Sequence, residues 1–99
     1  MLNKNNPTYD KIDDHLKESI IIFYLDAVPT GSFLKAVLSN DLVGAVGRAD
    51  RRNIKVLKDI VSFIYNEIPG ECWGNKKIVE NWTGADEQIK EYYKENGKL

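Results

Sequence analysis

Apolar residues in the first third of the chain recur at steps of three and four, which is the pattern of an amphipathic helix. The positions that carry this pattern are Tyr9, Ile12, Leu16, Ile20, Phe23 and Ala27. Thr8 is suited to cap the start of the helix, and Pro29 pushes the residue before it away from helical geometry. The pattern therefore predicts a first helix over residues 9–27.

The last part of this helix, from Ile20 to Leu25, is apolar on every side. A helix that is apolar all round must be covered all round. A chain of 99 residues has few helices with which to supply a partner on each side. We therefore expect another copy of the chain to cover part of this surface.

A second helix is predicted from Gly31 or Ser32 to Arg48. Its buried stripe consists of Phe33, Leu34, Val37, Leu38, Leu42 and either Ala45 or Val46. Gly44 and Gly47 weaken this helix by about 1 kcal/mol each relative to alanine. Such a cost indicates close backbone approach or a helix end.

A third helix is predicted from Arg51 to Ile68, with Asp50 as its cap and Pro69-Gly70 as its stop. It carries two apolar stripes, one of Ile54, Leu57, Val61, Ile64 and Ile68 and the other of Val56, Ile60 and Phe63. Two stripes exceed what one three-helix core hides, so we expect self-association through closed symmetry.

The remainder of the chain predicts shorter helices. Asn75 is placed to cap a short helix that Gly84 closes, and a charged, weakly amphipathic helix follows. The predicted fold class is all-α: a compact, oligomeric protomer of three main helices plus short C-terminal helices. Residues 1–8 are expected to be a flexible tail, residues 9–84 a single helical domain, and residues 85–99 a charged C-terminal helix or tail.

Composition narrows the class of protein. Hydrophobic residues make up 42% of the chain and charged residues 29%, which is typical of a soluble globular domain. The longest apolar run is far shorter than a membrane span, and the N-terminus lacks the pattern of a signal peptide. One cysteine and one histidine offer neither an internal disulfide nor a metal site. We expect a cytoplasmic protein without cofactor or metal.

The charges argue against binding to duplex nucleic acid, because the net charge is −1 and such proteins depend on basic faces. All three arginines, however, lie within five residues, at Arg48, Arg51 and Arg52. Arginine suits phosphate oxygens, so the cluster is a candidate phosphate site. The alternative is an ordinary solvated helix start.

No pattern in the sequence indicates catalysis. Ser32 has no histidine near it in sequence, because the one histidine is His15 on the first helix. Cys72 lies beside Trp73, where a packed thiol is the commoner arrangement than a nucleophile. We therefore expect that the protein is not an enzyme.

Two predicted helices begin with cations. Lys35 lies in the first turn of the second helix, and Arg51 with Arg52 begins the third. Each has the wrong sign for the positive end of the helix dipole, whereas a bound phosphate would reverse that disadvantage. The turn of Thr30, Gly31 and Ser32 adds hydroxyl donors and open backbone. The alternative is that these cations pair with Asp26, Asp41 or Asp50.

Trp73 is the candidate aromatic partner of a nucleobase. It follows a proline break, in a loop where a structural tryptophan has less packing to gain. Bases stack on exposed aromatic side chains for roughly 1–3 kcal/mol each. The alternative is that Trp73 is a lid over the helix ends. The predicted ligand-binding residues are Thr30, Gly31, Ser32, Lys35, Arg48, Arg51, Arg52 and Trp73.

A distinctive block of sequence resembles a known family. The runs "VPTGSFLKAVLSNDLVGAVGRADRRN" and "IVSFIYNEIPGECWG", followed by Trp82, are similar to a set of small phage-encoded proteins. We identify this set as the phage anti-CBASS sponge family, which sequesters cyclic oligonucleotide second messengers. The resemblance covers residues 20–83.

The resemblance implies an all-helical protomer assembled into a homohexamer in the cytoplasm of an infected bacterium. It also implies that cyclic dinucleotides bind at protomer interfaces and that some members hold cyclic trinucleotides in separate pockets, without chemistry. The matching positions are Thr30, Gly31, Arg48, Asn66, Trp73 and Gly74. Membership does not say which of these touch ligand. The rival hypotheses are a small helical regulator that binds DNA or a host protein, a phage assembly adaptor, and a hydrolase of the same messenger.

Overall fold

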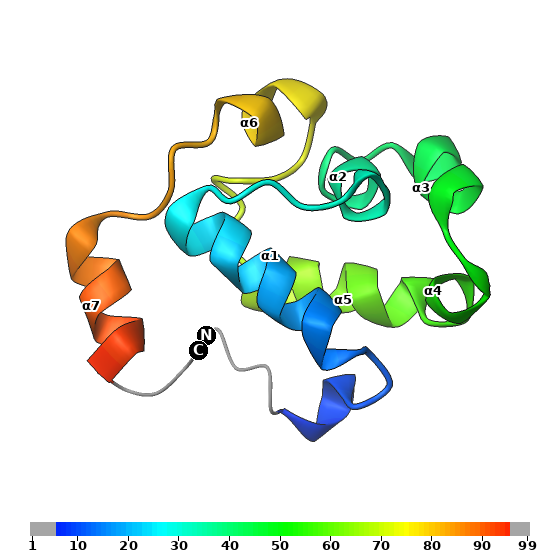
Figure 1. Cartoon of the computed structure of the whole chain (residues 1–99), viewed down its shortest axis with the longest axis horizontal. Coiled ribbons are helices and arrows are strands. Elements are labelled where there is room, and N and C mark those ends of the chain that lie inside the picture. Colours follow the sequence, from blue (N-terminus) through cyan, green and yellow to red (C-terminus); the bar gives the residue numbers. More distant parts are fainter. Residues whose placement is uncertain (1–5, 96–99) are drawn as a thin grey trace.

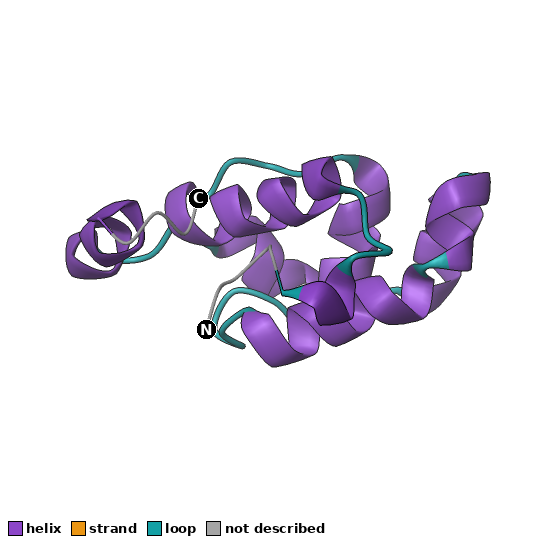
Figure 2. Cartoon of the chain, turned by 90° about the horizontal axis from the view of Figure 1, so that it is seen from below, coloured by secondary structure: helices purple, strands orange, loops and turns teal. Residues whose placement is uncertain are grey.

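Helices account for all regular structure in residues 6–95, the part of the chain that the computed structural model describes (Figure 2). The elements are η1 (Pro7–Tyr9, a 3-10 helix), α1 (Asp14–Asp26), α2 (Ser32–Leu38), α3 (Leu42–Arg48), α4 (Arg51–Lys55), α5 (Leu57–Glu67), α6 (Lys76–Asn81) and α7 (Glu87–Glu95). The all-α prediction is confirmed for these residues. The molecule is flattened, with extents of 37 × 31 × 18 Å, and α7 lies at the opposite end from α3 and α4 (Figure 1).

The start of the chain departs from the prediction that Thr8 caps a helix beginning at residue 9. Asn6 caps the 3-10 helix η1, and Asp13 caps α1 by accepting a hydrogen bond from the His15 backbone N–H over 2.9 Å. This arrangement turns Tyr9 back onto Phe63 of α5, with the two rings edge to face at 5.2 Å. The buried Lys17 amine then donates to the Tyr9 carbonyl over 3.2 Å. Of the predicted tail, residues 1–5 lie outside the described part.

The apolar end of α1 is buried within the single chain. Ile20, Ile21, Phe23, Tyr24 and Leu25 are each at most 4% exposed, and of this run only Ile22 reaches solvent, at 38%. The pattern of a helix that is apolar on every side is therefore confirmed. The inference that one chain cannot cover such a helix is wrong, because these residues belong to a core built from the rest of the same chain, and a C-terminal segment covers the end of the helix.

That segment consists of residues 82–85 and lies against the end of α1. The Trp82 ring stacks on Tyr24 at 5.8 Å, and its Nε1–H donates to the Tyr24 carbonyl over 2.8 Å. The Ala85 N–H donates to the carbonyls of both Tyr24 and Leu25, at 3.1 and 3.0 Å. These bonds satisfy carbonyls that the last turn of a helix leaves without partners. Residue Gly84, expected to close α6, instead brings the chain onto α1.

The predicted second helix is two helices, α2 and α3, which pack on each other. Asn40 adopts a left-handed conformation with φ of 61°, and the Asp41 N–H donates back to the Ala36 carbonyl over 2.9 Å. Asp41 then caps α3 by accepting from the Gly44 N–H over 2.9 Å. The apolar stripe runs through this break without interruption, and for that reason the periodicity alone predicts one helix.

The predicted third helix is divided at Val56 into α4 and α5. The Asp50 cap is confirmed by its hydrogen bond from the Asn53 N–H, at 2.7 Å. Of the two predicted stripes, Ile60, Phe63, Ile64 and Ile68 are buried in the core, whereas Ile54 and Val61 are 43% and 47% exposed. The Asn75 cap of α6 is also confirmed, at 2.8 Å from the Ile78 N–H.

Candidate functional site

Three of the predicted binding residues meet around one cavity of about 540 Å³. They are Ser32 and Lys35 of α2 and Arg48 of α3, and Lys76 at the start of α6 joins them. The full lining is Ser32, Lys35, Ala36, Ser39, Asp41, Arg48 and Lys76. We call it the basic cavity, because three cations and one carboxylate line it. These residues meet because α2 packs against both α3 and α6.

The cations of the basic cavity differ in what they contact. Lys35 Nζ lies 3.1 Å from Glu80 Oε2, and both side chains are nearly half exposed. Arg48 Nη1 donates to the Gly44 carbonyl over 3.3 Å. Within the described residues, neither Arg48 nor Lys76 lies within ion-pair distance of a carboxylate. Two of the three positive charges are therefore available to an anion.

Ser39 also lines this cavity, and sequence reasoning missed it. Its Oγ atom is buried and has no hydrogen-bond partner in the described part of the chain. Buried polar groups in folded proteins are almost always bonded, so this unbonded hydroxyl is an exception at the wall of the cavity. Lys76 was also missed, because a pair of lysines in a predicted loop carries no specific signal.

The structure contradicts the argument that Lys35 and Arg52 carry the wrong charge for their place in a helix. Helix α2 has only seven residues, so Lys35 also lies in its last turn, and Arg52 lies in the last turn of the five-residue α4. A cation near the C-terminal end of a helix is favourable rather than adverse. Arg52 further pairs with Asp13 at 3.0 Å. The alternative, that these cations pair with Asp26, Asp41 or Asp50, is wrong in its partners: Lys35 pairs with Glu80 and Arg52 with Asp13.

The other predicted residues lie apart from the basic cavity. Thr30 lines a separate cavity of about 250 Å³ beside Lys35, and its Oγ1 donates to the Gly31 carbonyl over 3.2 Å. Gly31 is the N-cap residue of α2, and because glycine has no side chain this helix start has no side-chain capping hydrogen bond. Arg51 and Arg52 line neither this cavity nor the basic cavity, and they are also absent from the lining of the cavity that contains Trp73. Of the predicted turn only Ser32 lines the basic cavity, and of the arginine cluster only Arg48 does.

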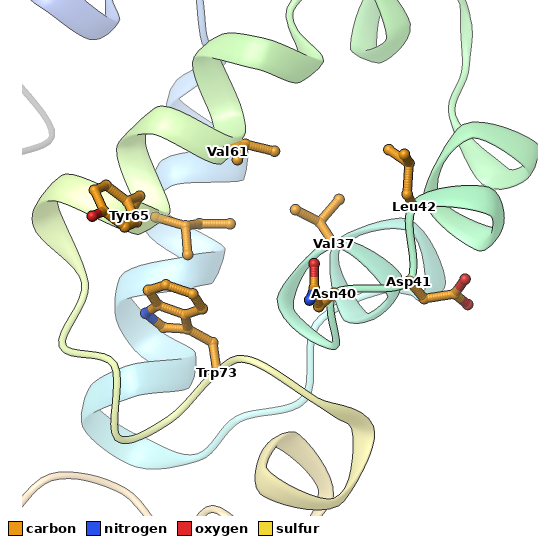
Figure 3. Close-up of a pocket in the computed structure, with 8 residues that line it drawn as sticks. Val37, Asn40, Asp41, Leu42, Val61, Tyr65 and Trp73 are labelled. Carbon is orange, nitrogen blue, oxygen red and sulfur yellow. The ribbon is translucent and has the colours of Figure 1, made fainter.

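Trp73 lines a second cavity, of about 350 Å³, between the α2–α3 turn and α5 (Figure 3). Its lining is Val37, Asn40, Asp41, Leu42, Val61, Ile64, Tyr65 and Trp73, and we call it the aromatic groove. The Trp73 Nε1–H donates to the Ile68 carbonyl over 2.9 Å, and its ring lies 6.4 Å from that of Tyr65, which is 73% exposed. Trp73 is half-buried against the core, so it both packs and presents a face to the groove.

The two cavities meet at the turn between α2 and α3. Asp41 lines both of them, and its carboxylate points away from Trp73 in Figure 3. The Gly74 N–H donates to the Leu38 carbonyl over 2.8 Å, and this hydrogen bond holds the loop that contains Trp73 against the end of α2. A cation-lined cavity and an aromatic groove are therefore held side by side by the backbone.

Gly44 lies under the side chains that border the basic cavity. A Cβ there would lie 2.7 Å from Asp41 Cγ and 2.8 Å from Arg48 Nη1, whereas a Cβ at Gly47 would meet nothing within 4 Å. We expect Gly47→Ala to stabilise the protein by up to about 1 kcal/mol through helix propensity. Gly44→Ala should displace the Asp41 cap, which costs about 0.5–2 kcal/mol. Urea unfolding should therefore rank Gly47→Ala above Gly44→Ala by about 1–2 kcal/mol, and equal stability of the two would contradict the clash.

Cys72 is a packed thiol in the structure. It is fully buried, its Sγ lies 3.4 Å from the Pro69 carbonyl, and burial raises the pKa of the thiol to about 12. Because the thiolate is the reactive form, we expect iodoacetamide at about pH 8 to label native protein at least ~100-fold more slowly than urea-unfolded protein. Labelling at equal rates would show that the thiol is open to solvent.

The raised pKa of Cys72 has a consequence for stability. In the unfolded chain the thiol has its ordinary pKa of 9.0, whereas in the folded protein the raised pKa keeps it protonated until the pH approaches about 12. Its contribution to stability is therefore fully present below pH 9 and is lost as pH rises towards 12. Burial acts in the same direction on Tyr24, whose pKa is raised from 10.0 to about 12.

Within residues 6–95, no group of three or more His, Cys, Asp or Glu side chains is placed to hold a metal ion. The same residues include no helix long and apolar enough to cross a membrane. No protein-family model, curated protein or solved structure matches this chain. The case for function therefore depends on the two cavities and on the residues that line them.

Proposed function

We propose that this protein binds a small nucleotide without transforming it, and that cyclic di- or trinucleotide second messengers are its ligand class. The observation that carries the proposal is the basic cavity beside the aromatic groove, with Asp41 as their common wall. The biological role that fits this chemistry is that of a phage anti-defence protein. By sequestering the messenger in the cytoplasm of an infected bacterium, it would block CBASS-type signalling.

The residues that line each cavity indicate which part of the ligand it would bind. Arg48 and Lys76 supply charge to phosphate oxygens, and the exposed Ser32 offers a hydroxyl donor at the same wall. Trp73 and Tyr65 offer aromatic faces to a base in the adjoining groove. A ligand that carries phosphate and base a short distance apart matches both linings. The −1 net charge disfavours a long polyanion as the ligand.

We also infer that the protein self-associates, with a hexamer as the expected assembly. The support is α3, whose Leu42, Val43 and Val46 side chains are 68%, 85% and 48% exposed, whereas Ala45 is buried. Exposed apolar residues clustered on one short helix favour burial against another protein surface. We propose that a second copy of this chain covers the exposed side chains of α3, because a net charge of −1 causes little electrostatic repulsion between copies. Native mass spectrometry tests this, and a monomer at micromolar concentration would refute it.

The decisive experiment is a calorimetric titration of the purified protein with 3′,3′-cyclic GMP-AMP and with cyclic tri-adenylate. The bound ligand is then released by heating and identified by chromatography. Saturable binding with recovery of intact ligand supports the proposal. Recovery of cleaved ligand would instead make the protein a hydrolase. A panel of cyclic oligonucleotides that shows no binding at all would refute the proposed function.

A second candidate function is that of a phage assembly adaptor or small helical regulator that binds a host protein or DNA. The exposed α3 side chains favour this candidate as well, because they suit any protein partner. The two candidates separate in the same titration. An adaptor would oligomerise and ignore every nucleotide.

A further inference from the structure

We propose that Asn40 reads the base that lies in the aromatic groove, and that it selects adenine over guanine. This inference rests on the proposed function, since it names the base that the same site prefers. It concerns a residue whose backbone and side chain carry separate roles. The backbone ends α2, and the side chain faces the groove (Figure 3).

The backbone at position 40 requires a left-handed residue but not an asparagine. Asn40 has a φ of 61°, its N–H donates to the Val37 carbonyl over 3.1 Å, and the next N–H donates to the Ala36 carbonyl. This is the geometry of a helix C-terminus, where glycine is the preferred residue and asparagine the usual substitute. Glycine would meet the conformational need at least as well, so the turn alone does not explain the amide side chain.

The side chain lies where a ligand would need a polar contact. Asn40 is exposed, and its amide makes no hydrogen bond to any other residue of the described chain. In Figure 3 it projects into the space between Trp73 and Leu42. Most of the other side chains that line the groove are apolar or aromatic. Pockets of this kind use a few polar groups to orient and select their ligands.

The other polar groups at the groove are less suited to this role. The Asp41 carboxylate already accepts from the Gly44 N–H as the cap of α3 and faces the basic cavity. Tyr65 is 73% exposed at the rim and offers a single hydroxyl. Asn40 alone presents a donor and an acceptor side by side.

The amide pattern decides between the two purines. A primary amide can accept from the adenine N6–H and donate to the adjacent ring nitrogen at the same time. Guanine presents its O6 acceptor and its N1–H and N2–H donors in an arrangement that a carboxylate satisfies better. An asparagine at this place therefore favours adenine, and an aspartate would favour guanine.

The test compares cyclic di-AMP with cyclic di-GMP as probes of wild-type protein, Asn40→Gly and Asn40→Asp by isothermal titration calorimetry. Both substitutions tolerate the left-handed backbone, so each variant should keep the wild-type helicity and unfolding midpoint. We expect the wild type to bind cyclic di-AMP about 10-fold or more tightly than cyclic di-GMP. Asn40→Gly should bring this ratio close to one, and Asn40→Asp should reverse it.

The outcomes separate this inference from the function on which it depends. If wild-type protein binds these nucleotides and Asn40→Gly leaves the ratio of affinities unchanged, base reading by Asn40 is refuted and the proposed function stands. A wild-type preference for cyclic di-GMP would also overturn the inference alone. If the wild type binds neither probe nor any other cyclic oligonucleotide, both proposals fail together.

Discussion

A double variant, Arg48→Gln with Lys76→Gln, is expected to bind 3′,3′-cyclic GMP-AMP about 10- to 100-fold more weakly than the wild type. These two cations face the basic cavity and, in the described part of the chain, have no carboxylate within ion-pair distance. Their charges are therefore free to pair with phosphate. Both side chains are exposed, so their removal should leave the unfolding free energy close to the wild-type value. Calorimetry measures the affinity, and urea unfolding measures the stability.

The matched control is Arg51→Gln with Lys77→Gln. It removes the same two charge types from neighbouring positions on α4 and α6, and neither residue lines the basic cavity. We expect this control to change the affinity by less than about threefold, since solvent screens charges that do not contact the ligand. If the control loses as much affinity as the cavity variant, attraction is general to the surface. The basic cavity would then have no specific role.

The elements of the fold differ in how well the sequence predicts them. Asp50 and Asn75 are caps in the structure as predicted, because a cap depends on residues within one turn. The break between α2 and α3 was missed although it also has a local signal. Asn40 followed by Asp41 combines a helix end with a helix cap, but the apolar stripe through both helices outweighed it. Nothing in the sequence around Val56 signals the break between α4 and α5.

The site was predicted less completely than the fold. Sequence pattern selects Ser32 and Lys35 for their place near a supposed helix start and Arg48 for its place in the arginine cluster, yet the three meet because α2 packs on α3 and α6. Ser39 and Lys76 were missed for the same reason, since only tertiary packing gives them their role. Sequence pattern thus indicates which residue types are available, whereas long-range packing decides which of them share a cavity.

Gly84 is the clearest case of a residue whose role depends on long-range packing. It has a φ of 99°, and a Cβ there would lie 2.8 Å from the Leu25 carbonyl oxygen. An added methyl group would therefore push residues 82–85 off the end of α1. The hydrogen bonds at risk are those from the Ala85 N–H to Tyr24 and Leu25 and from the Trp82 indole to Tyr24.

Gly84→Ala is expected to lower the free energy of unfolding by about 2–4 kcal/mol, from backbone strain and lost hydrogen bonds together. That is a large part of the roughly 5–15 kcal/mol that stabilises a domain of this size. Urea unfolding followed by circular dichroism measures the loss, and hydrogen exchange at the Ala85 amide should accelerate with it. Gly70→Ala is the matched control, because it lies in an exposed turn where a Cβ meets nothing within 4 Å. Equal stability of the two variants would show that residues 82–85 do not hold α1 in place.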